Sequence, residues 1–211
     1  MYSHFIFDID GTLIDTERTG LGSLGRTVKE FLGVDMDNET LFRYFGIPSI
    51  KAAEMLWSSD PARFLERWEE IYQDMVHLSA PFEGIETVLK SLSGKGITLG
   101  LVTSRSRYEF EKDDHLAAWL DMFACAICSE DTLRHKPDPD PILAYMEKTG
   151  AEASECLYLG DTPHDAACAQ GAGVDFALVD WNGRGIDIPS ARYKLTSPGQ
   201  IISISELRTG A

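Results

Sequence analysis

The sequence predicts an α/β protein: a parallel sheet covered by helices on both faces, with a block of helices inserted after the first strand. Three observations support this fold class. Short apolar runs recur along the 211 residues, segments of helical spacing separate them, and the alternation is interrupted from residue 16 to residue 80. Alternating strands and helices favour a parallel sheet, whose strands are buried on both faces and therefore have continuous apolar character.

Outside that interval the expected elements follow one another in a regular order. The first strand is the run FIFDI, and the helix that opens the second part of the chain has Ile85, Val88, Leu89 and Leu92 at helical spacing. Strands are expected at residues 5–9, 97–103, 123–128, 156–160 and 174–179, and helices at 85–92, 108–120, 141–149 and 164–171. A late strand and a late helix are expected after residue 181.

The interrupted interval contains apolar residues at helical spacing and no convincing strand. Helices are expected at 21–32, 49–57 and 61–78, the last with an aromatic stripe of Phe64, Trp68 and Tyr72 that we interpret as the core of this block. The predicted division is therefore an α/β core of residues 1–15 and 81–211 and a helical domain of residues 16–80. Ligands of open α/β sheets bind beyond the carboxyl ends of the strands, so an insertion that begins there would cover the site.

The charge of the chain excludes several classes of partner. A net charge of −15 disfavours binding to nucleic acid or to an anionic membrane surface. No run approaches the roughly 20 apolar residues of a membrane span, and the N-terminus lacks a basic segment followed by an apolar one. Four cysteines are too few for a disulfide scaffold, and we interpret Cys125 and Cys128 as buried strand residues. These observations favour the cytoplasm.

Acidic and other polar residues follow the expected strands at the points where the strands end. Because the carboxyl ends of parallel strands lie at one edge of the sheet, these residues are expected to converge there. The set comprises Asp8, Asp10, Thr103, Ser104, Lys136, Asp161 and Asp165.

This set of residues suits phosphoryl transfer. Carboxylates that converge repel one another unless a cation joins them, and hard oxygen ligands suit Mg²⁺. A hydroxyl and a lysine beside such a cation make an anion site despite the negative net charge, and phosphoryl transfer depends mostly on positioning and charge neutralisation. A carboxylate can act as the nucleophile, and a second carboxyl group can protonate the leaving alcohol and then activate water.

The order and spacing of these residues resemble the four motifs of the haloacid dehalogenase (HAD) superfamily. The motifs are DIDGTL from Asp8, the strand end at Thr103, Lys136 followed by Pro137, and GDTPHD from Gly160. The resemblance covers the whole chain, and the inserted helices resemble the C1-type cap of the phosphoglycolate phosphatase and β-phosphoglucomutase branch. It implies a Rossmann-like three-layer core with an α-helical cap.

The resemblance also implies a role for each residue of the motifs. Asp8 is expected to be the nucleophile and a Mg²⁺ ligand, and Asp10 the general acid and base, with its backbone carbonyl on the metal. Thr103, the Ser104 amide and the turn at Gly11 are expected to hold the phosphoryl group, and Lys136 to stabilise the charge of the phosphoaspartate. Asp161 and Asp165 are expected to complete the metal site, Asp165 directly or through water.

The cap is expected to choose the substrate. In the branch that the chain resembles, a loop like the one at Gly46 reaches the leaving group, which makes Ser49 and Lys51 the candidates for that contact. A helix N-cap at Ser49 and a solvated Lys51 are the alternative.

The expected function is Mg²⁺-dependent hydrolysis of a small phosphate monoester through phospho-Asp8, with phosphoglycolate as the leading candidate from resemblance. The alternatives are a phosphomutase of the β-phosphoglucomutase kind, a pyrophosphatase and, ranked low, a non-catalytic protein that binds a phosphometabolite or a partner. The expected partner is a small phosphorylated metabolite, and the expected assembly a monomer or a homodimer.

Overall fold

A six-stranded parallel sheet forms the centre of the computed structural model, which describes residues 2–206. The strand order is β5-β4-β1-β6-β7-β8, so β1 lies between β4 and β6. The strands are β1 (His4–Phe7), β4 (Thr98–Val102), β5 (Phe123–Ile127), β6 (Cys156–Gly160), β7 (Asp175–Val179) and β8 (Tyr193–Leu195). The prediction of a parallel sheet is confirmed, and β8 is the expected late strand.

Helices cover both faces of the sheet, as predicted, because successive strand residues point to opposite faces. Phe5 and Phe7 of β1 pack in one apolar cluster with α5 (Ile85–Gly94) and α10 (Gln200–Glu206), whereas Ile6 packs in the other with α8 (Asp140–Thr149) and α9 (Pro163–Ala172). The core helices are α5 (Ile85–Gly94), α6 (Arg107–Glu111), α7 (Asp114–Ala117), α8 (Asp140–Thr149), α9 (Pro163–Ala172) and α10 (Gln200–Glu206), with short 3₁₀ turns η2 (Leu120–Met122), η3 (Ser129–Asp131) and η4 (Ala153–Glu155).

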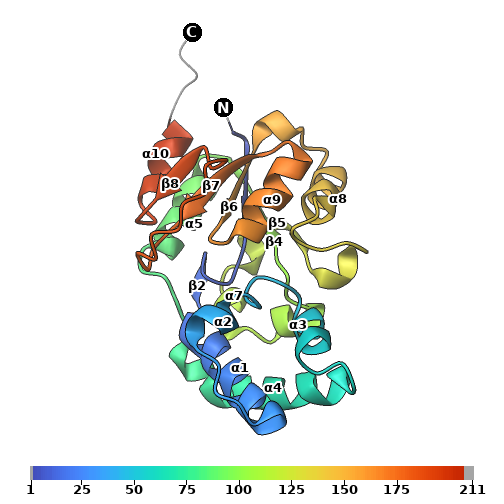
Figure 1. Ribbon diagram of the computed structural model, residues 1–211. Helices are drawn as coiled ribbons and strands as arrows, with labels where there is room; N and C mark the ends of the chain where they lie inside the picture. The colour runs from blue at the N-terminus through green and yellow to red at the C-terminus, as the bar shows by residue number, and fades with distance from the viewer. Residues whose placement is uncertain (1, 207–211) are drawn as a thin grey trace.

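The interval between the first two sheet strands folds into a group of helices, here called the helical cap. It consists of α1 (Glu17–Leu32), α2 (Asn38–Phe42), α3 (Ser49–Leu56), α4 (Pro61–Met75) and the 3₁₀ turn η1 (Val76–Leu78). Its own apolar cluster contains Leu24, Val28 and Phe64, all almost fully buried. The helical cap lies over the edge of the sheet where β1 ends, as Figure 1 shows.

Two short antiparallel strands join the helical cap to the core. β2 (Ile14–Asp15) precedes α1, β3 (Ala80–Pro81) follows η1, and Ile14 pairs with Pro81. Beside them, the Ser79 hydroxyl donates to Thr19 Oγ1 at 2.7 Å, which links the end of the helical cap to its first helix. Both connections between cap and core therefore run side by side through one two-stranded ribbon.

One predicted helix is broken in the structure. The sequence predicts a single helix at 108–120, but the chain forms α6, then α7, then η2. The break lies at Asp113, whose carboxylate accepts from the backbone N–H groups of His115 and Leu116 and so begins a new helix. The same carboxylate also accepts from Arg105, a contact between elements that the helical spacing does not reveal.

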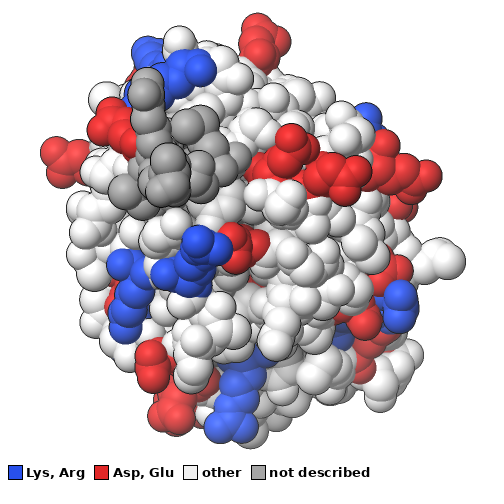
Figure 2. Space-filling model, turned by 90° about the horizontal axis from the view of Figure 1, so that it is seen from above, with Lys and Arg blue, Asp and Glu red and all other residues white. Residues whose placement is uncertain are grey.

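The face of the molecule opposite the helical cap has a mixed charge distribution. In Figure 2, which views the molecule from above, Lys and Arg side chains lie in separate places among Asp, Glu and uncharged residues wherever grey atoms do not cover the surface. Within residues 2–206, no helix combines the length and the apolar character needed to cross a bilayer.

Candidate active site

Three neighbouring strands deliver the predicted residues to one point beyond the sheet. Asp8 follows β1, Thr103 follows β4 and Asp161 follows β6, and β1 lies between the other two. The backbone N–H of Asp8 donates to Leu159 O at 2.9 Å, so pairing between β1 and β6 continues to the first residue of the motif. The sheet therefore fixes the Asp8 side chain beside that of Asp161.

Lys136 joins two of the carboxylates. Its Nζ lies 2.7 Å from Asp8 Oδ1 and 2.7 Å from Asp165 Oδ1, and all three side chains are buried. Burial alone lowers the pKa of Lys136, but the charges of Asp165 and Asp8 outweigh it and raise that pKa above its ordinary value. A buried lysine between two carboxylates thus keeps its positive charge and offsets part of their repulsion.

The ionisation of Asp8 remains costly even beside Lys136. Burial raises its pKa well above the ordinary value, Lys136 opposes this rise, and the neighbouring Asp165 and Asp161 add to it. Burial also raises the pKa of Asp161 to about 7, with Asp165 adding to the rise and Arg184 opposing it. An ionised set of these carboxylates would be stabilised by a further cation.

The donor atoms fit a divalent metal. One carboxylate oxygen from each of Asp8, Asp161 and Asp165 lies within 4.8 Å of the others. Asp161 Oδ1 is buried and has no hydrogen-bond partner among residues 2–206, as expected of an oxygen placed to bind a cation. A side chain at Gly11 would place its Cβ within 3 Å of this carboxylate, so glycine at this position is what allows Asp161 to approach the backbone of the first motif. Hard carboxylate oxygens suit Mg²⁺.

Asp165 is held by more contacts than the other two carboxylates. Its Oδ1 accepts from Lys136 and from the Tyr158 hydroxyl, and its Oδ2 accepts from the backbone N–H and the hydroxyl of Thr162. Burial raises its pKa, but Lys136 and these hydrogen bonds outweigh burial and lower it. Because both oxygens already have partners, Asp165 positions Lys136 and is better arranged to reach a metal through water.

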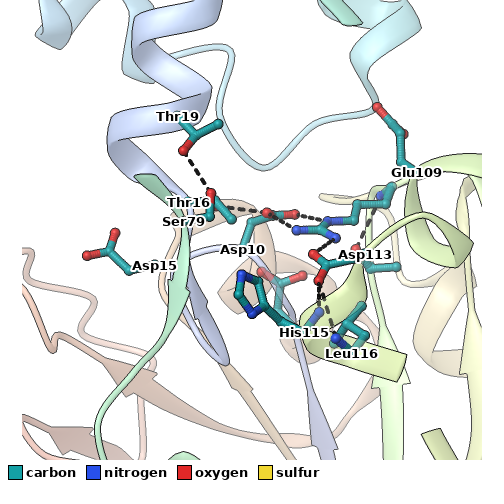
Figure 3. A network of polar contacts seen from close by, with 12 residues as sticks. Asp10, Asp15, Thr16, Thr19, Ser79, Glu109, Asp113, His115 and Leu116 are labelled. Atoms are coloured by element: carbon teal, nitrogen blue, oxygen red, sulfur yellow. Dashed lines mark hydrogen bonds and ion pairs between the residues drawn. The ribbon is translucent and has the colours of Figure 1, made fainter. Parts of the chain in front are cut away.

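Asp10 is held by Arg105 rather than by Lys136. Its Oδ1 lies 2.8 Å from Arg105 Nη2 and its Oδ2 lies 2.9 Å from Arg105 Nε, while the Thr16 hydroxyl donates to Oδ1 at 2.8 Å. Figure 3 shows Asp10 between Thr16, at the start of the helical cap, and Asp113 of the core. Burial raises the pKa of Asp10, but the Arg105 guanidinium outweighs burial and lowers it.

Arg105 is a residue of this site that the sequence motifs do not include. It is buried, and its Nη1 also contacts Asp113 Oδ2 at 2.6 Å, so one guanidinium bridges two carboxylates. Its position two residues after Thr103, in a loop at the end of a strand, is the signal that could have revealed it. Nothing in the spacing of the sequence indicates that Asp10 and Asp113 meet there.

The remaining predicted core residues also lie at this edge. Thr103 is buried, and its hydroxyl accepts from the backbone N–H of Arg105 at 3.2 Å. The Ser104 hydroxyl donates to the backbone carbonyl of Gly46 at 2.7 Å. Ser104 therefore ties the core to the loop of the helical cap that was expected to reach the site.

The two predicted cap residues have different surroundings: Ser49 faces the space between the helical cap and the core, whereas Lys51 does not. The Ser49 hydroxyl donates to Glu109 Oε1 of the core at 2.7 Å, so it forms a contact between cap and core. Lys51 is exposed and its Nζ pairs with Glu54 at 3.0 Å, one turn along the same helix. The structure corrects the expectation for Lys51: α3 begins at Ser49 and turns this side chain toward solvent.

Arg184 is a second basic residue at this edge of the sheet that lies outside the four motifs. Its Nη2 contacts Asp161 Oδ2, its Nη1 lies 3.6 Å from Glu17 Oε2, and its guanidinium lies over the Phe42 ring. It therefore links the acidic group at the end of β6 to the helical cap. It sits between Gly183 and Gly185 in a loop whose path the sequence does not define.

A cavity of about 110 Å³ lies between the helical cap and the core, next to Asp10. Its core wall includes Asp10, Ser104 and Arg105, and its cap wall includes Trp68 and Tyr72. The aromatic residues of α4 therefore lie in two environments. Phe64 is fully buried in the cap, whereas Trp68 and Tyr72 also face the cavity.

Comparison with known proteins agrees with this arrangement. A family model described as haloacid dehalogenase-like hydrolase matches residues 5–179, which include every residue of the four motifs. The chain belongs to this family. Among solved structures of HAD-like proteins, one from Lactobacillus plantarum with a provisional phosphoglycolate phosphatase name has a TM-score of 0.84 and 26% identity, and the match covers 97% of this chain and 99% of that one.

The names of curated relatives in the family indicate a different substrate. A protein of Caldanaerobacter subterraneus, provisionally named pyrophosphatase PpaX, is 32% identical over 179 residues, which cover 84% of this chain and 81% of the relative. Pyrophosphatase PpaX of Oceanobacillus iheyensis is 28% identical over 178 residues, with 84% of this chain and 83% of the relative covered. The family is thus shared, whereas the named substrates differ between relatives.

Proposed function

We propose that this HAD-family phosphatase hydrolyses a small phosphate monoester in a Mg²⁺-dependent reaction, with Asp8 as the nucleophile. The observation that carries the proposal is the buried group of Asp8, Asp161 and Asp165 around Lys136, with Asp10 on the side of the cavity. Bound Mg²⁺ would be held by Asp8, Asp161 and the Asp10 backbone carbonyl, with Asp165 through water, and would neutralise charge on the carboxylates and the phosphoryl oxygens.

In the first half of the reaction, an Asp8 carboxylate oxygen forms a bond to phosphorus as the ester P–O bond breaks. Lys136 holds Asp8 Oδ1, which leaves the second oxygen of this carboxylate for attack. Asp10 donates its proton to the departing alkoxide, which leaves as the alcohol. The Thr103 hydroxyl and the Ser104 backbone N–H are the candidates for holding the phosphoryl oxygens.

In the second half, a water molecule replaces the alcohol. Asp10, now ionised, removes a proton from this water, and the oxygen attacks phosphorus as the bond to Asp8 breaks. Inorganic phosphate and the Asp8 carboxylate are the products, and Asp10 is protonated again. Lys136 stabilises the negative charge that returns to Asp8.

One named substrate candidate fits this proposal, and a second is an alternative to it. Phosphoglycolate follows from the resemblance to the phosphoglycolate phosphatase branch and from the name of the Lactobacillus plantarum structure. Pyrophosphate follows from the names of the PpaX relatives. A phosphomutase needs a second phosphate-binding cation in the cap, and no Lys or Arg of residues 16–80, all of which the structure describes, lines the cavity.

The proposal predicts that phosphate release needs both Mg²⁺ and Asp8. We expect the Asp8→Asn variant to lose about a thousandfold or more of the activity, because the amide is a poor nucleophile. Phosphate release would be measured on a panel of phosphate esters with Mg²⁺ and with chelator, for the wild type, Asp8→Asn and the exposed control Asp121→Asn.

Thermal unfolding of the three proteins would show whether the Asp8→Asn variant is folded. If the folded variant retained wild-type activity, Asp8 would not be the nucleophile. If no ester released phosphate with Mg²⁺, the phosphatase proposal itself would fail, and the non-catalytic alternative would take its place.

A further inference from the structure

The cavity beside Asp10 has an excess of negative side chains, although a phosphatase substrate is itself an anion. Asp8 is not among the residues that line it, whereas Asp10 is. If Asp10 protonates the leaving alcohol, the leaving group lies on this side of Asp10 and occupies the cavity. The charged residues that line it are four carboxylates and two cations: Asp10, Glu69, Glu109 and Asp113, and Arg105 and Lys112.

Arg105 is the buried cation of this cavity, but its guanidinium is already paired with two carboxylates. Two of its nitrogens contact Asp10 and a third contacts Asp113, and the side chains of Arg105 and Asp113 are at least nine-tenths buried. A negative group on the substrate would reach the guanidinium only by displacing one of these carboxylates. The displaced carboxylate would then be left without its partner in a poorly solvated place, which is costly.

The other cations near the cavity are poorly placed to bind an anion inside it. Lys112 is exposed, and its Nζ lies 5.7 Å from the centre of the Tyr108 ring, at the surface. The helical cap adds no basic residue to the lining, since Lys51 pairs with Glu54 at the surface. A second phosphate or a carboxylate on the leaving group would therefore meet no free, buried cation among the described residues.

The cap wall of the cavity is mostly apolar and aromatic. Its polar side chains are neutral (Thr16, Ser49 and Gln73) except for one acidic residue on α4. Leu65, Trp68 and Tyr72 of α4 line it, and Trp68 Nε1 donates to Ser23 Oγ at 2.9 Å, which fixes the indole ring. Glu69 lies beside them. Burial raises its pKa and Glu109 adds to the rise, while a hydrogen bond from Gln73 and the charge of Arg105 oppose it. A positive group here would relieve this repulsion and would be attracted to the aromatic rings, whereas an anion would lose its hydration without compensation.

From this lining we infer that the enzyme prefers phosphate monoesters whose leaving group is uncharged or positively charged, such as an alkyl or aminoalkyl alcohol. It discriminates against substrates whose leaving group carries a second anion, which include phosphoglycolate and pyrophosphate. The inference rests on the proposed function, because it assumes that Asp10 protonates a leaving group that sits in the cavity.

Three phosphate esters of similar size test the inference, because they differ mainly in the charge of the leaving group. They are ethyl phosphate, phosphoethanolamine and phosphoglycolate, and pyrophosphate would be measured beside them. We expect kcat/KM with Mg²⁺ to be higher for ethyl phosphate and phosphoethanolamine than for phosphoglycolate, by about tenfold or more.

A substitution in the cap wall tests which residue carries the preference. Glu69→Gln keeps the size of the side chain and removes its charge, so we expect the ratio of kcat/KM for phosphoethanolamine to that for phosphoglycolate to fall several-fold. Glu66→Gln is the matched control: the residue is on the same helix and exposed, and it does not line the cavity. This control should leave the ratio unchanged.

The possible outcomes separate the inference from the proposed function. If phosphoglycolate or pyrophosphate is turned over as well as ethyl phosphate or better, the inference is wrong while the phosphatase proposal stands. An unchanged ratio in Glu69→Gln would also overturn the role given to the cavity charge. If Mg²⁺ supports hydrolysis of none of the four compounds, the proposed function and the inference fail together.

Discussion

A bidentate ion pair controls how readily Asp10 holds a proton. A general acid must be protonated when the leaving group departs, yet Arg105 stabilises the ionised form of Asp10. The pair therefore favours the carboxylate that activates water in the second half of the reaction. Thr16 donates to the same carboxylate from the start of the helical cap, so the protonation state of Asp10 is linked to the position of the cap.

Removing the guanidinium should move the pH profile of the enzyme. In Arg105→Gln, Asp10 loses the positive neighbour that lowers its pKa, so we expect this pKa to rise. The limb of the kcat/KM profile that reports protonated Asp10 would extend to higher pH. The profile would be measured with ethyl phosphate, whose leaving alcohol needs a proton.

Two further variants identify that limb. Arg105→Lys retains a positive charge and should shift the profile much less than Arg105→Gln. Asp10→Asn removes the titrating group, so the limb should disappear. A profile that is identical in the wild type and Arg105→Gln would show that Arg105 does not control Asp10. Asp113 also loses its partner in Arg105→Gln, and a lower melting temperature is therefore expected.

At the scale of elements, a loop of the helical cap is fixed against the core beside the site. Gly46 adopts a φ of +82°, its carbonyl accepts from the Ser104 hydroxyl, and a Cβ on it would lie 3.2 Å from Thr162 Cγ2. Ser49, three residues on, donates to Glu109 of the core. These contacts close the cap over the cavity, which would exclude water during the reaction.

An alanine at Gly46 should weaken this closed arrangement. The added Cβ meets Thr162 and also strains the backbone, so we expect kcat/KM to fall about tenfold, a change of about 1.4 kcal/mol. Gly33→Ala is the matched control, because Gly33 has a φ of +71° with nothing within 4 Å of a Cβ.

The two variants separate backbone strain from contact with the core. Both should lose about 1 kcal/mol of stability, because alanine is strained at positive φ. Only Gly46→Ala should lose activity. Equal activity in the two variants would mean that the loop contact does not matter for the reaction.

At the scale of the whole molecule, the edge of the sheet concentrates buried carboxylates that destabilise the metal-free protein. The pKa of Asp161 is about 7 in the folded protein and near 4 in the unfolded chain, so the folded state binds more protons between these values. The free energy of unfolding should therefore fall as the pH rises from about 4 to about 7.

Magnesium should reverse this loss of stability. The cation replaces protons at the carboxylates, so its effect on the melting temperature should be larger at pH 8 than at pH 5. At a concentration near 100 times the Kd, binding adds about 2.7 kcal/mol, which corresponds to roughly 5–10 °C for a chain of this size. Thermal unfolding with Mg²⁺ and with chelator at the two pH values would measure it.

Asp161→Asn is the informative variant for the metal site. It removes a proposed ligand and the titrating group, so the melting temperature should lose most of its response to Mg²⁺ and part of its pH dependence. A full response to Mg²⁺ in this variant would contradict the assignment of Asp161 as a ligand.

Local patterns in the sequence were sufficient to predict the sheet, its helices and the edge at which chemistry is expected. Apolar runs followed by Asp8, Thr103 and Asp161 are local patterns, and parallel pairing brings their ends together whatever the details of packing. The helical character of residues 16–80 was equally readable, because a buried face at helical spacing is a property of one segment.

The contacts between segments far apart in the chain are apparent only in the folded structure. Arg105 contacts both Asp10 and Asp113, and Asp113 lies where the helix that the spacing predicted as continuous is broken. Lys51 faces solvent and Trp68 faces the cavity because of where α3 and α4 pack, which no local pattern records. Charge pairing and cavity lining depend on three-dimensional neighbours, so the identity of the substrate depends on the fold rather than on the motifs.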